Sequence, residues 1–231
     1  MIHGFEKGMM KDDIELVIDY PTNIAAKLVN DDIDVGLVPV AIIPRLKQFE
    51  IISDFCIACD GAVGSVCVFS DLPLEEVDTI LLDYQSRSSV GLLRVLLKEY
   101  WQLSPRLVEA AEGYEGCISG TTAGLVIGDR ALSQRLHSKY IYDLGDAWKQ
   151  LTGLPFVFAA WVSNKQLANG FINSFNEANS FGIKHLEEVI HEHPFEKYDL
   201  HRYYNGNIIF KPQFEKLEII NLFLKKLNTL Q

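Results

Sequence analysis

The sequence lacks any run of about 18 apolar residues, which is what a helix needs to cross a bilayer. The first seven residues also lack the apolar core of a secretory signal. Positive charge is scarce, because 21 lysines and arginines face 31 aspartates and glutamates, for a net charge of −10. That balance disfavours nucleic acids and anionic membranes as partners. These shortages predict a soluble, cytoplasmic protein.

Cysteine is scarce too. Three of the four cysteines (Cys56, Cys59, Cys67 and Cys117) lie in apolar runs, which predicts reduced, buried thiols rather than a disulfide framework. Cys56 and Cys59 have the spacing of a redox or metal pair, but no second pair follows and the flanking residues indicate a strand.

Histidines gather late in the chain, at His185, His191 and His193 beside Glu192. Their spacing does not put three ligands on one face of a helix, so we expect a solvated helix end and no metal site. The chain also lacks a phosphate-binding glycine loop, a dinucleotide fingerprint and a Gly-x-Ser-x-Gly elbow.

What the 231 residues do contain is an ordinary globular composition, 48% hydrophobic and 23% charged, large enough for one domain or two small lobes. Apolar strands alternate with amphipathic helices, which predicts an α/β fold. We expect strands at 14–18, 34–40, 49–57, 66–69, 79–82, 107–108, 123–127 and 156–162. We expect helices at 24–29, 90–101, 143–151, 164–170, 171–191 and 214–230.

Two strongly apolar strands, at 66–69 and 156–162, bracket the middle of the chain, and we interpret them as paired crossovers between two lobes. Residues 1–70 and 160–231 would form the first lobe, and residues 71–159 an inserted second lobe. Chains of this kind form a hinged cleft, where small ligands bind.

The stretch 60–70 is the first candidate site. Gly61 and Gly64 allow a tight turn and a close approach of a ligand to the main chain, and the turn delivers the hydroxyl of Ser65 into an apolar strand. Asp60 either contacts a ligand or only stabilises its glycine turn.

A second candidate is the cluster of Ser86, Arg87, Ser88 and Ser89, which precedes an apolar helix. Hydroxyls, free N–H groups and the positive end of the helix dipole would converge there and hold a carboxylate. The alternative is that one serine merely caps the helix and that Arg87 forms a surface ion pair.

A third candidate is Gly128 with Asp129, at the end of a buried strand, where ligands bind in open α/β sheets. Asp129 could contact a hydroxyl or accept a proton, or it could cap residues 130–136. The sequence leaves both interpretations open.

Five motifs together resemble the chorismate dehydratase family of menaquinone biosynthesis, over nearly the whole chain. They are Asp34-Val35-Gly36-Leu37-Val38-Pro39-Val40, Asp60-Gly61-Ala62-Val63-Gly64-Ser65-Val66, Ser86-Arg87-Ser88-Ser89-Val90, Ile127-Gly128-Asp129, and the stretch 143–159 with Thr152-Gly153-Leu154-Pro155. The resemblance implies a two-lobed fold like that of the type II periplasmic binding proteins, used for catalysis in the cytoplasm. It also implies a lyase that converts chorismate to 3-[(1-carboxyvinyl)oxy]benzoate, the first step of the futalosine route, without a metal or organic cofactor.

Applied to the three candidate segments, the resemblance implies that Ser65 and Asp129 are catalytic. The implied substrate-binding residues are Asp60, Gly64, Ser86, Arg87, Ser88, Ser89 and Gly128. Chorismate carries two carboxylates, which donors at Ser65 and at the helix start near Ser88 and Ser89 could hold. The base could be Asp129 or the substrate's own side-chain carboxylate.

The chain departs from the family at its start, where members usually have a strand, a polar turn and a Pro-Phe pair before the segment matched by residues 2–6. A late start codon, a truncation or a homologue without activity would each explain this; with a truncation we expect an unpaired sheet position and weak catalysis. Two other functions stay open: a non-catalytic protein that binds a small carboxylate, and the sister enzyme acting on cyclic dehypoxanthine futalosine. We expect a monomer or a homodimer.

Overall fold

A computed structural model describes residues 1–230, and its internal contacts divide the chain into two compact units. Unit 1 comprises residues 1–58 and 157–215, and unit 2 comprises residues 59–156 and the described residues from Lys216 onward. The chain passes between the units within β2 (Glu50–Cys59), again within β8 (Phe156–Ser163), and a third time between Glu215 and Lys216. The division therefore differs from the expected one, because the first boundary falls 12 residues earlier than residue 70.

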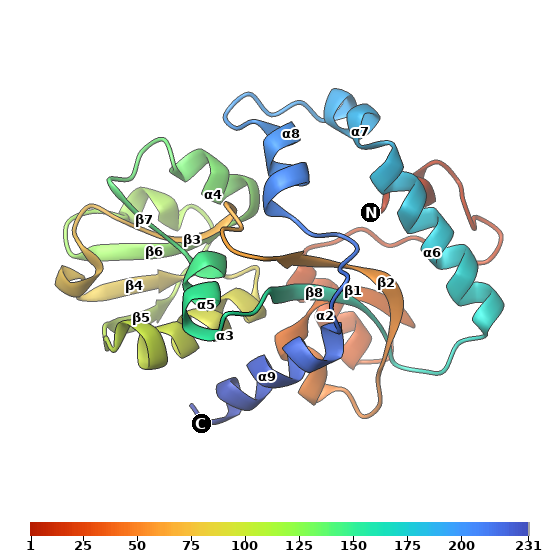
Figure 1. Cartoon of the computed structure of the whole chain (residues 1–231), viewed down its shortest axis with the longest axis horizontal. Helices are drawn as coiled ribbons and strands as arrows, with labels where there is room; N and C mark the ends of the chain where they lie inside the picture. The colour runs from red at the N-terminus through yellow and green to blue at the C-terminus, as the bar shows by residue number, and fades with distance from the viewer. Residues whose placement is uncertain (231) are drawn as a thin grey trace. The chain divides into compact units, whose positions relative to one another are not determined.

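Unit 1 contains a three-stranded sheet in the order β1-β8-β2 (Figure 1). β1 (Val35–Pro39) runs antiparallel to β8, with Gly36 opposite Val162. The helices of this unit are α1 (His3–Glu6), α2 (Pro21–Val29), α6 (Asn169–Lys184), α7 (Leu186–Glu192) and α8 (Leu200–Arg202). The predicted strand 34–40 and the helix at 24–29 are thereby confirmed.

The core of unit 1 forms where α1 and α6 meet this sheet. The ring of Phe175 lies 4.9 Å from both Phe5 and Trp161, measured between centroids, and all three side chains are buried. The indole nitrogen of Trp161 donates a hydrogen bond to the buried Asn179 at 2.9 Å, so the polar group of this large side chain has a partner.

Two local predictions in unit 1 are wrong. Residues 14–20 form no regular secondary structure, and Ile18 and Tyr20 are 65% and 58% exposed. Residues 164–168 form no helix: the chain bends at residues 164 and 165, where the hydroxyl of Ser163 accepts a hydrogen bond from the backbone N–H of Lys165, and α6 begins only at Asn169. The predicted helix 171–191 is two helices, which separate at His185.

Unit 2 contains a five-stranded sheet in the order β5-β4-β6-β3-β7 (Figure 1). Its strands are β3 (Val66–Ser70), β4 (Thr79–Leu82), β5 (Arg106–Glu109), β6 (Thr122–Ile127) and β7 (Tyr140–Asp143). β4 runs parallel to β5 and β6, whereas β3 runs antiparallel to β6 and β7. The sequence predicted four of these strands but not β7.

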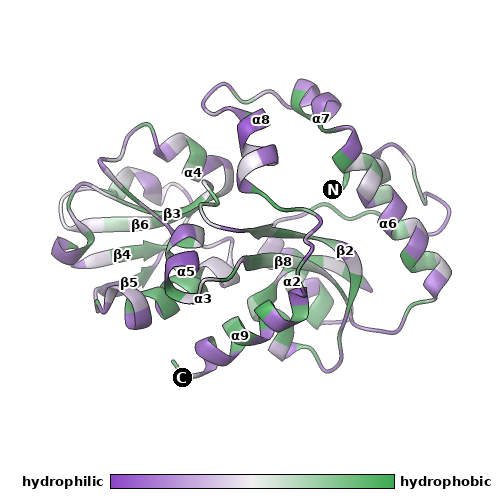
Figure 2. Cartoon of the chain, in the orientation of Figure 1, coloured by the Kyte–Doolittle hydropathy of each residue, from purple (hydrophilic) through white to green (hydrophobic). Residues whose placement is uncertain are grey.

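The helices of unit 2 are α3 (Arg87–Leu96), α4 (Gly128–Gln134), α5 (Leu144–Thr152) and α9 (Lys216–Asn228). We expected α9 in the first lobe, but it packs on α3, where Gly91 leaves room for Leu227 and Phe223. Phe223 also meets the ring of Phe156 at 5.0 Å and of Trp148 at 6.2 Å. Figure 2 shows apolar and polar residues alternating around α9, which fits a helix with one buried face.

Within residues 1–230, none of the helices combines the length and the apolar character that crossing a bilayer demands.

Candidate functional site

The three candidate segments meet at one edge of the sheet in unit 2. Because β4 and β6 are parallel, their carboxyl ends lead into the Ser86 and Gly128 segments at the same edge. β3 is antiparallel to β6, with Val66 opposite Ile127, so its amino end brings Ser65 there as well. The backbone N–H of Gly128 donates a hydrogen bond to the carbonyl oxygen of Ser65 at 2.8 Å, which joins two of the three segments directly.

The turn that carries Ser65 is held by a carboxylate from another part of the chain. Asp143 accepts hydrogen bonds from the backbone N–H groups of Val63 at 3.0 Å and Gly64 at 2.7 Å. Gly61 and Gly64 have φ of 110° and 77°, which other residues rarely adopt, so the predicted need for glycine in this turn is confirmed. The turn leaves Ser65 only 4% exposed.

Asp143 also caps α5. Its carboxylate accepts from the backbone N–H groups of Gly145 at 2.9 Å and Asp146 at 3.2 Å, two donors that a helix leaves unpaired at its start. One side chain therefore fixes both the start of α5 and the turn before Ser65. The sequence marks Asp143 as the start of a helix, but nothing in the local pattern indicates its contact with residues 63 and 64.

Gly145 lets α5 approach this turn closely. A Cβ atom at Gly145 would lie 2.5 Å from the carbonyl oxygen of Gly61 and 2.6 Å from the sulfur of Cys59. We expect Gly145→Ala to lower the free energy of unfolding by about 2 kcal/mol, because the backbone of the turn must move. Urea denaturation measures this, and Gly170→Ala, at the same position of α6 with nothing within 4 Å, is the matched control. An equal loss in both variants would contradict the prediction.

At the start of α3, Ser86 is the capping residue. Its hydroxyl oxygen accepts from the backbone N–H of Ser89 at 3.2 Å and lies 2.9 Å from the hydroxyl of Ser89. Ser88 is fully buried, and Arg87 is exposed. Ser86 therefore caps the helix, as the alternative interpretation predicted, and contact of Ser86, Arg87, Ser88 and Ser89 with a ligand stays a prediction.

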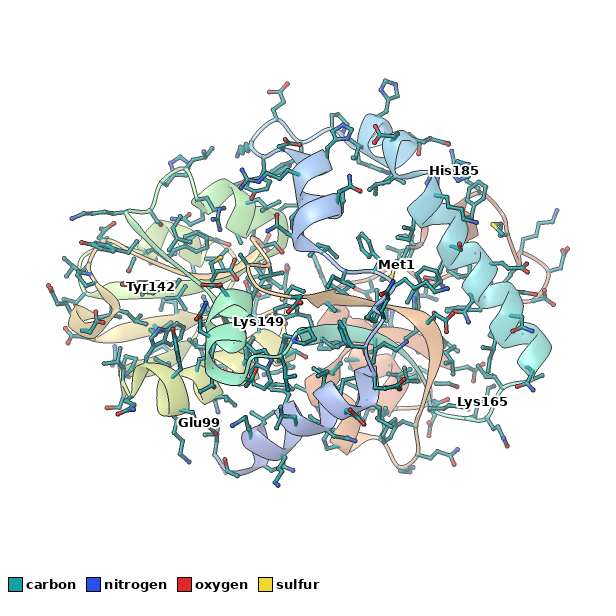
Figure 3. All side chains as sticks on the ribbon, viewed as in Figure 1. Met1, Glu99, Tyr142, Lys149, Lys165 and His185 are labelled. Atoms are coloured by element: carbon teal, nitrogen blue, oxygen red, sulfur yellow. The ribbon has the colours of Figure 1, made fainter. Side chains whose placement is uncertain are left out.

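Asp129 lies in the first turn of α4 and is exposed, but it is not the capping residue, because the helix begins one residue earlier at Gly128. The capping interpretation of Asp129 is therefore wrong. Its side chain is exposed and follows β6 at the end of the sheet that carries Ser65, and its catalytic role stays a prediction. Asp60 is also exposed and forms an ion pair with Lys149 at 2.6 Å (Lys149 is labelled in Figure 3).

A network of charged side chains around the buried Asp83, which the sequence did not indicate, links the segments that follow β4 and β6. Asp83 follows β4, is 2% exposed, and accepts hydrogen bonds from the backbone of Gln85 and from Arg130 at 2.8 Å each. The hydroxyl of Tyr114 lies 2.9 Å from the same carboxylate, and burial, with the negative charge of Asp83, raises the pKa of Tyr114. Asp83 thus fixes both the turn that leads to α3 and the residue next to Asp129 on α4.

The cysteines behave as core residues. Cys56, Cys59 and Cys67 are buried, as predicted, whereas Cys117 is exposed, and the structure of residues 1–230 places no disulfide at any of the four. Burial and the negative charge of Asp143 raise the pKa of the Cys67 thiol well above its ordinary value, although the guanidinium of Arg135, 3.4 Å from the sulfur, acts in the opposite direction.

Comparison with known proteins gives a match to the menaquinone biosynthesis family over residues 1–228. This chain belongs to that family. Its membership confirms the resemblance that the five motifs indicate, and those motifs contribute the turn before Ser65, the starts of α3 and α4, and the Asp143 cap.

A curated relative of this family member is the chorismate dehydratase of Thermus thermophilus, which is 32% identical to it. The match covers 68% of this chain and 65% of the relative, so the chain spans slightly less than two thirds of the relative's length.

Solved structures also resemble this family member. A protein from Archaeoglobus fulgidus superposes with a TM-score of 0.72 at 18% identity, covering 99% of this chain and 92% of that chain. An ABC transporter protein from Parabacteroides distasonis superposes with a TM-score of 0.62 at 16% identity, covering 100% and 89%. At such low identity these likenesses concern the fold alone, and they confirm the predicted α/β fold like that of the periplasmic binding proteins.

Proposed function

We propose that this protein is a lyase that removes water from chorismate and gives 3-[(1-carboxyvinyl)oxy]benzoate. The observation that carries the proposal is the meeting of Ser65, Gly128 and the Ser86 segment at one sheet edge, in a member of the menaquinone biosynthesis family. The chorismate dehydratase of Thermus thermophilus, 32% identical, supports the same reaction.

The charge of the substrate suits this edge. Chorismate carries two carboxylates, and the protein has a net charge of −10, so binding needs local positive potential. The first turn of α3, a ten-residue helix, offers backbone N–H groups and the positive end of the helix dipole, and Arg87 adds a guanidinium there.

The reaction needs little more than orientation and charge stabilisation. The proton to be removed is on the ring carbon that bears the enolpyruvyl ether. Its removal leaves a negative charge that is delocalised through the adjacent ring alkene onto the ring carboxylate. The neighbouring hydroxyl then leaves as water, taking up a proton, and the ring becomes aromatic. A hydroxyl at Ser65 that donates to the developing charge would lower the barrier.

Two bases are compatible with this scheme. Asp129 is an exposed carboxylate at the site, and the side-chain carboxylate of chorismate is the other acceptor. If Asp129 is the base, Asp129→Asn is expected to lower kcat at least 100-fold. Asp146→Asn, which changes an exposed aspartate in the first turn of α5, is the matched control.

The decisive experiment is incubation of the protein with chorismate, with the aromatic product followed by chromatography and ultraviolet absorbance. Multiple turnovers to the 3-substituted benzoate are expected. Saturable binding of chorismate without product would overturn the proposal in favour of a carboxylate-binding protein. Conversion of cyclic dehypoxanthine futalosine instead would identify the sister enzyme.

A further inference from the structure

A cluster of ligand-type side chains lies in unit 1, among residues that the proposed reaction does not use. It joins His3 on α1 to Glu188 and Glu192 on α7. We propose that these three side chains bind a divalent transition-metal ion of the zinc class. Met1 and His185, labelled in Figure 3, each precede one of the two helices that carry the ligands.

The imidazole of His3 is the first observation. His3 is only 4% exposed, and within residues 1–230 its Nε2 is the buried side-chain nitrogen or oxygen that has no hydrogen-bond partner. Leaving such an atom unsatisfied costs about 1–3 kcal/mol, so an unpaired buried nitrogen needs an explanation. The ring is held in place by stacking on Phe181, with centroids 6.2 Å apart and planes 16° from parallel.

The two glutamates are the second observation. They lie four residues apart on α7 and therefore share one face of the helix. His3 Nε2 lies 3.7 Å from Oε1 of Glu188, and His3 Nδ1 lies 3.8 Å from Oε2 of Glu192. Ligand atoms around a tetrahedral ion with bonds of about 2.0–2.2 Å stand roughly 3.3–3.6 Å apart. Only one ring nitrogen of His3 can bind the ion, and one ligand atom from each of the three side chains lies within 4.8 Å of the others. Rotation of the two exposed glutamate side chains would shorten these distances to those of a tetrahedral site, with water as the fourth ligand.

A positive charge already occupies the space between the carboxylates. The ammonium of Lys7 lies 2.7 Å from Oε1 of Glu188 and 2.9 Å from Oε1 of Glu192. It pairs with the glutamates but leaves the buried Nε2 of His3 without a hydrogen-bond partner. Lys7 is 40% exposed, so its long side chain can turn into solvent and give way to a metal ion, which would satisfy all three groups at once.

The ion would tie α1 to α7. These helices have four and seven residues, too short to be stable by themselves in water, so a bond between them would stabilise this part of unit 1. The histidines near the end of α7 did not predict such a site, and only Glu192 belongs to both groups. The third ligand, His3, lies near the start of the sequence, far from Glu188 and Glu192.

Titration calorimetry with zinc chloride at pH 7, on protein without an affinity tag, tests the proposal. One zinc ion per chain is expected to bind. His3→Gln and Glu188→Gln should each weaken binding at least tenfold. Lys7→Met, which removes the competing ammonium, should strengthen it. Zinc should also raise the melting temperature of the original protein but not that of His3→Gln, and a chelator should reverse the shift.

His193→Gln is the matched control, because His193 is exposed, ends α7 and lies outside the cluster. Its affinity for zinc should equal that of the original protein. Absence of saturable binding, unchanged binding in both His3→Gln and Glu188→Gln, or an equal loss in His193→Gln would each overturn the proposal. Glu188 is 43% exposed in its side chain, so its variant tests the site even if the buried His3→Gln variant does not fold.

Discussion

Replacing Ser65 by alanine is expected to lower kcat for chorismate dehydration about 100-fold, with little change in the folded structure. The hydroxyl lies at the sheet edge where the candidate segments meet, and loss of one positioned donor to a developing charge typically costs 100-fold or more. Steady-state kinetics of product formation measures the effect, and circular dichroism checks the fold.

Ser70→Ala is the control for that result. Ser70 is the buried last residue of β3, the strand that directly follows Ser65, and its hydroxyl donates a hydrogen bond to the carbonyl oxygen of Leu72 at 2.6 Å. Its loss should cost about 1 kcal/mol of stability and leave kcat within a factor of two. Unchanged kinetics in Ser65→Ala would remove Ser65 from the site, and an equal fall in both variants would indicate a general effect on the strand.

Replacing Asp143 by alanine is expected to lower the free energy of unfolding by about 3 kcal/mol. The substitution removes the acceptor of four backbone N–H groups, two at the start of α5 and two in the turn before Ser65, and hydrogen bonds to a charged acceptor are stronger than neutral ones. Urea denaturation followed by circular dichroism measures the loss. Because the released turn carries Ser65, kcat/KM for chorismate should fall as well.

Asp146→Ala separates the loss of the Asp143 hydrogen bonds from the loss of a negative charge that interacts with the helix dipole. Asp146 lies in the first turn of the same helix and is exposed, so its loss should cost about 0.3–1 kcal/mol. The account of Asp143 as a link between α5 and the turn would be contradicted if both variants lost the same stability.

Local structure in this chain follows closely from the sequence where apolar runs end at clear breaks. β4 occupies residues 79–82, as predicted, and β8 extends the predicted strand by a single residue to Ser163. Each of these runs consists mainly of apolar or β-branched residues and is bounded by turn signals. The spacing of its apolar residues and its length are then typical of a strand.

Two failed predictions share a cause, since they depend on a partner that the local pattern does not contain. Residues 14–18 alternate like a strand, yet they form none, because alternation does not provide a neighbouring strand to pair with. The helical period of α9 indicated a buried face correctly, but it could not say which surface would cover that face.

The sequence by itself determined the α/β class, the family and three short segments with ligand-binding chemistry, because each of these depends on neighbours within a few residues. Only the tertiary structure decided that those segments share an edge, that Asp143 holds the turn before Ser65, and that His3 faces Glu188 and Glu192. Strand order and helix packing set such contacts between distant residues, and the free energy that selects them is a sum over the whole core rather than a property of any one stretch.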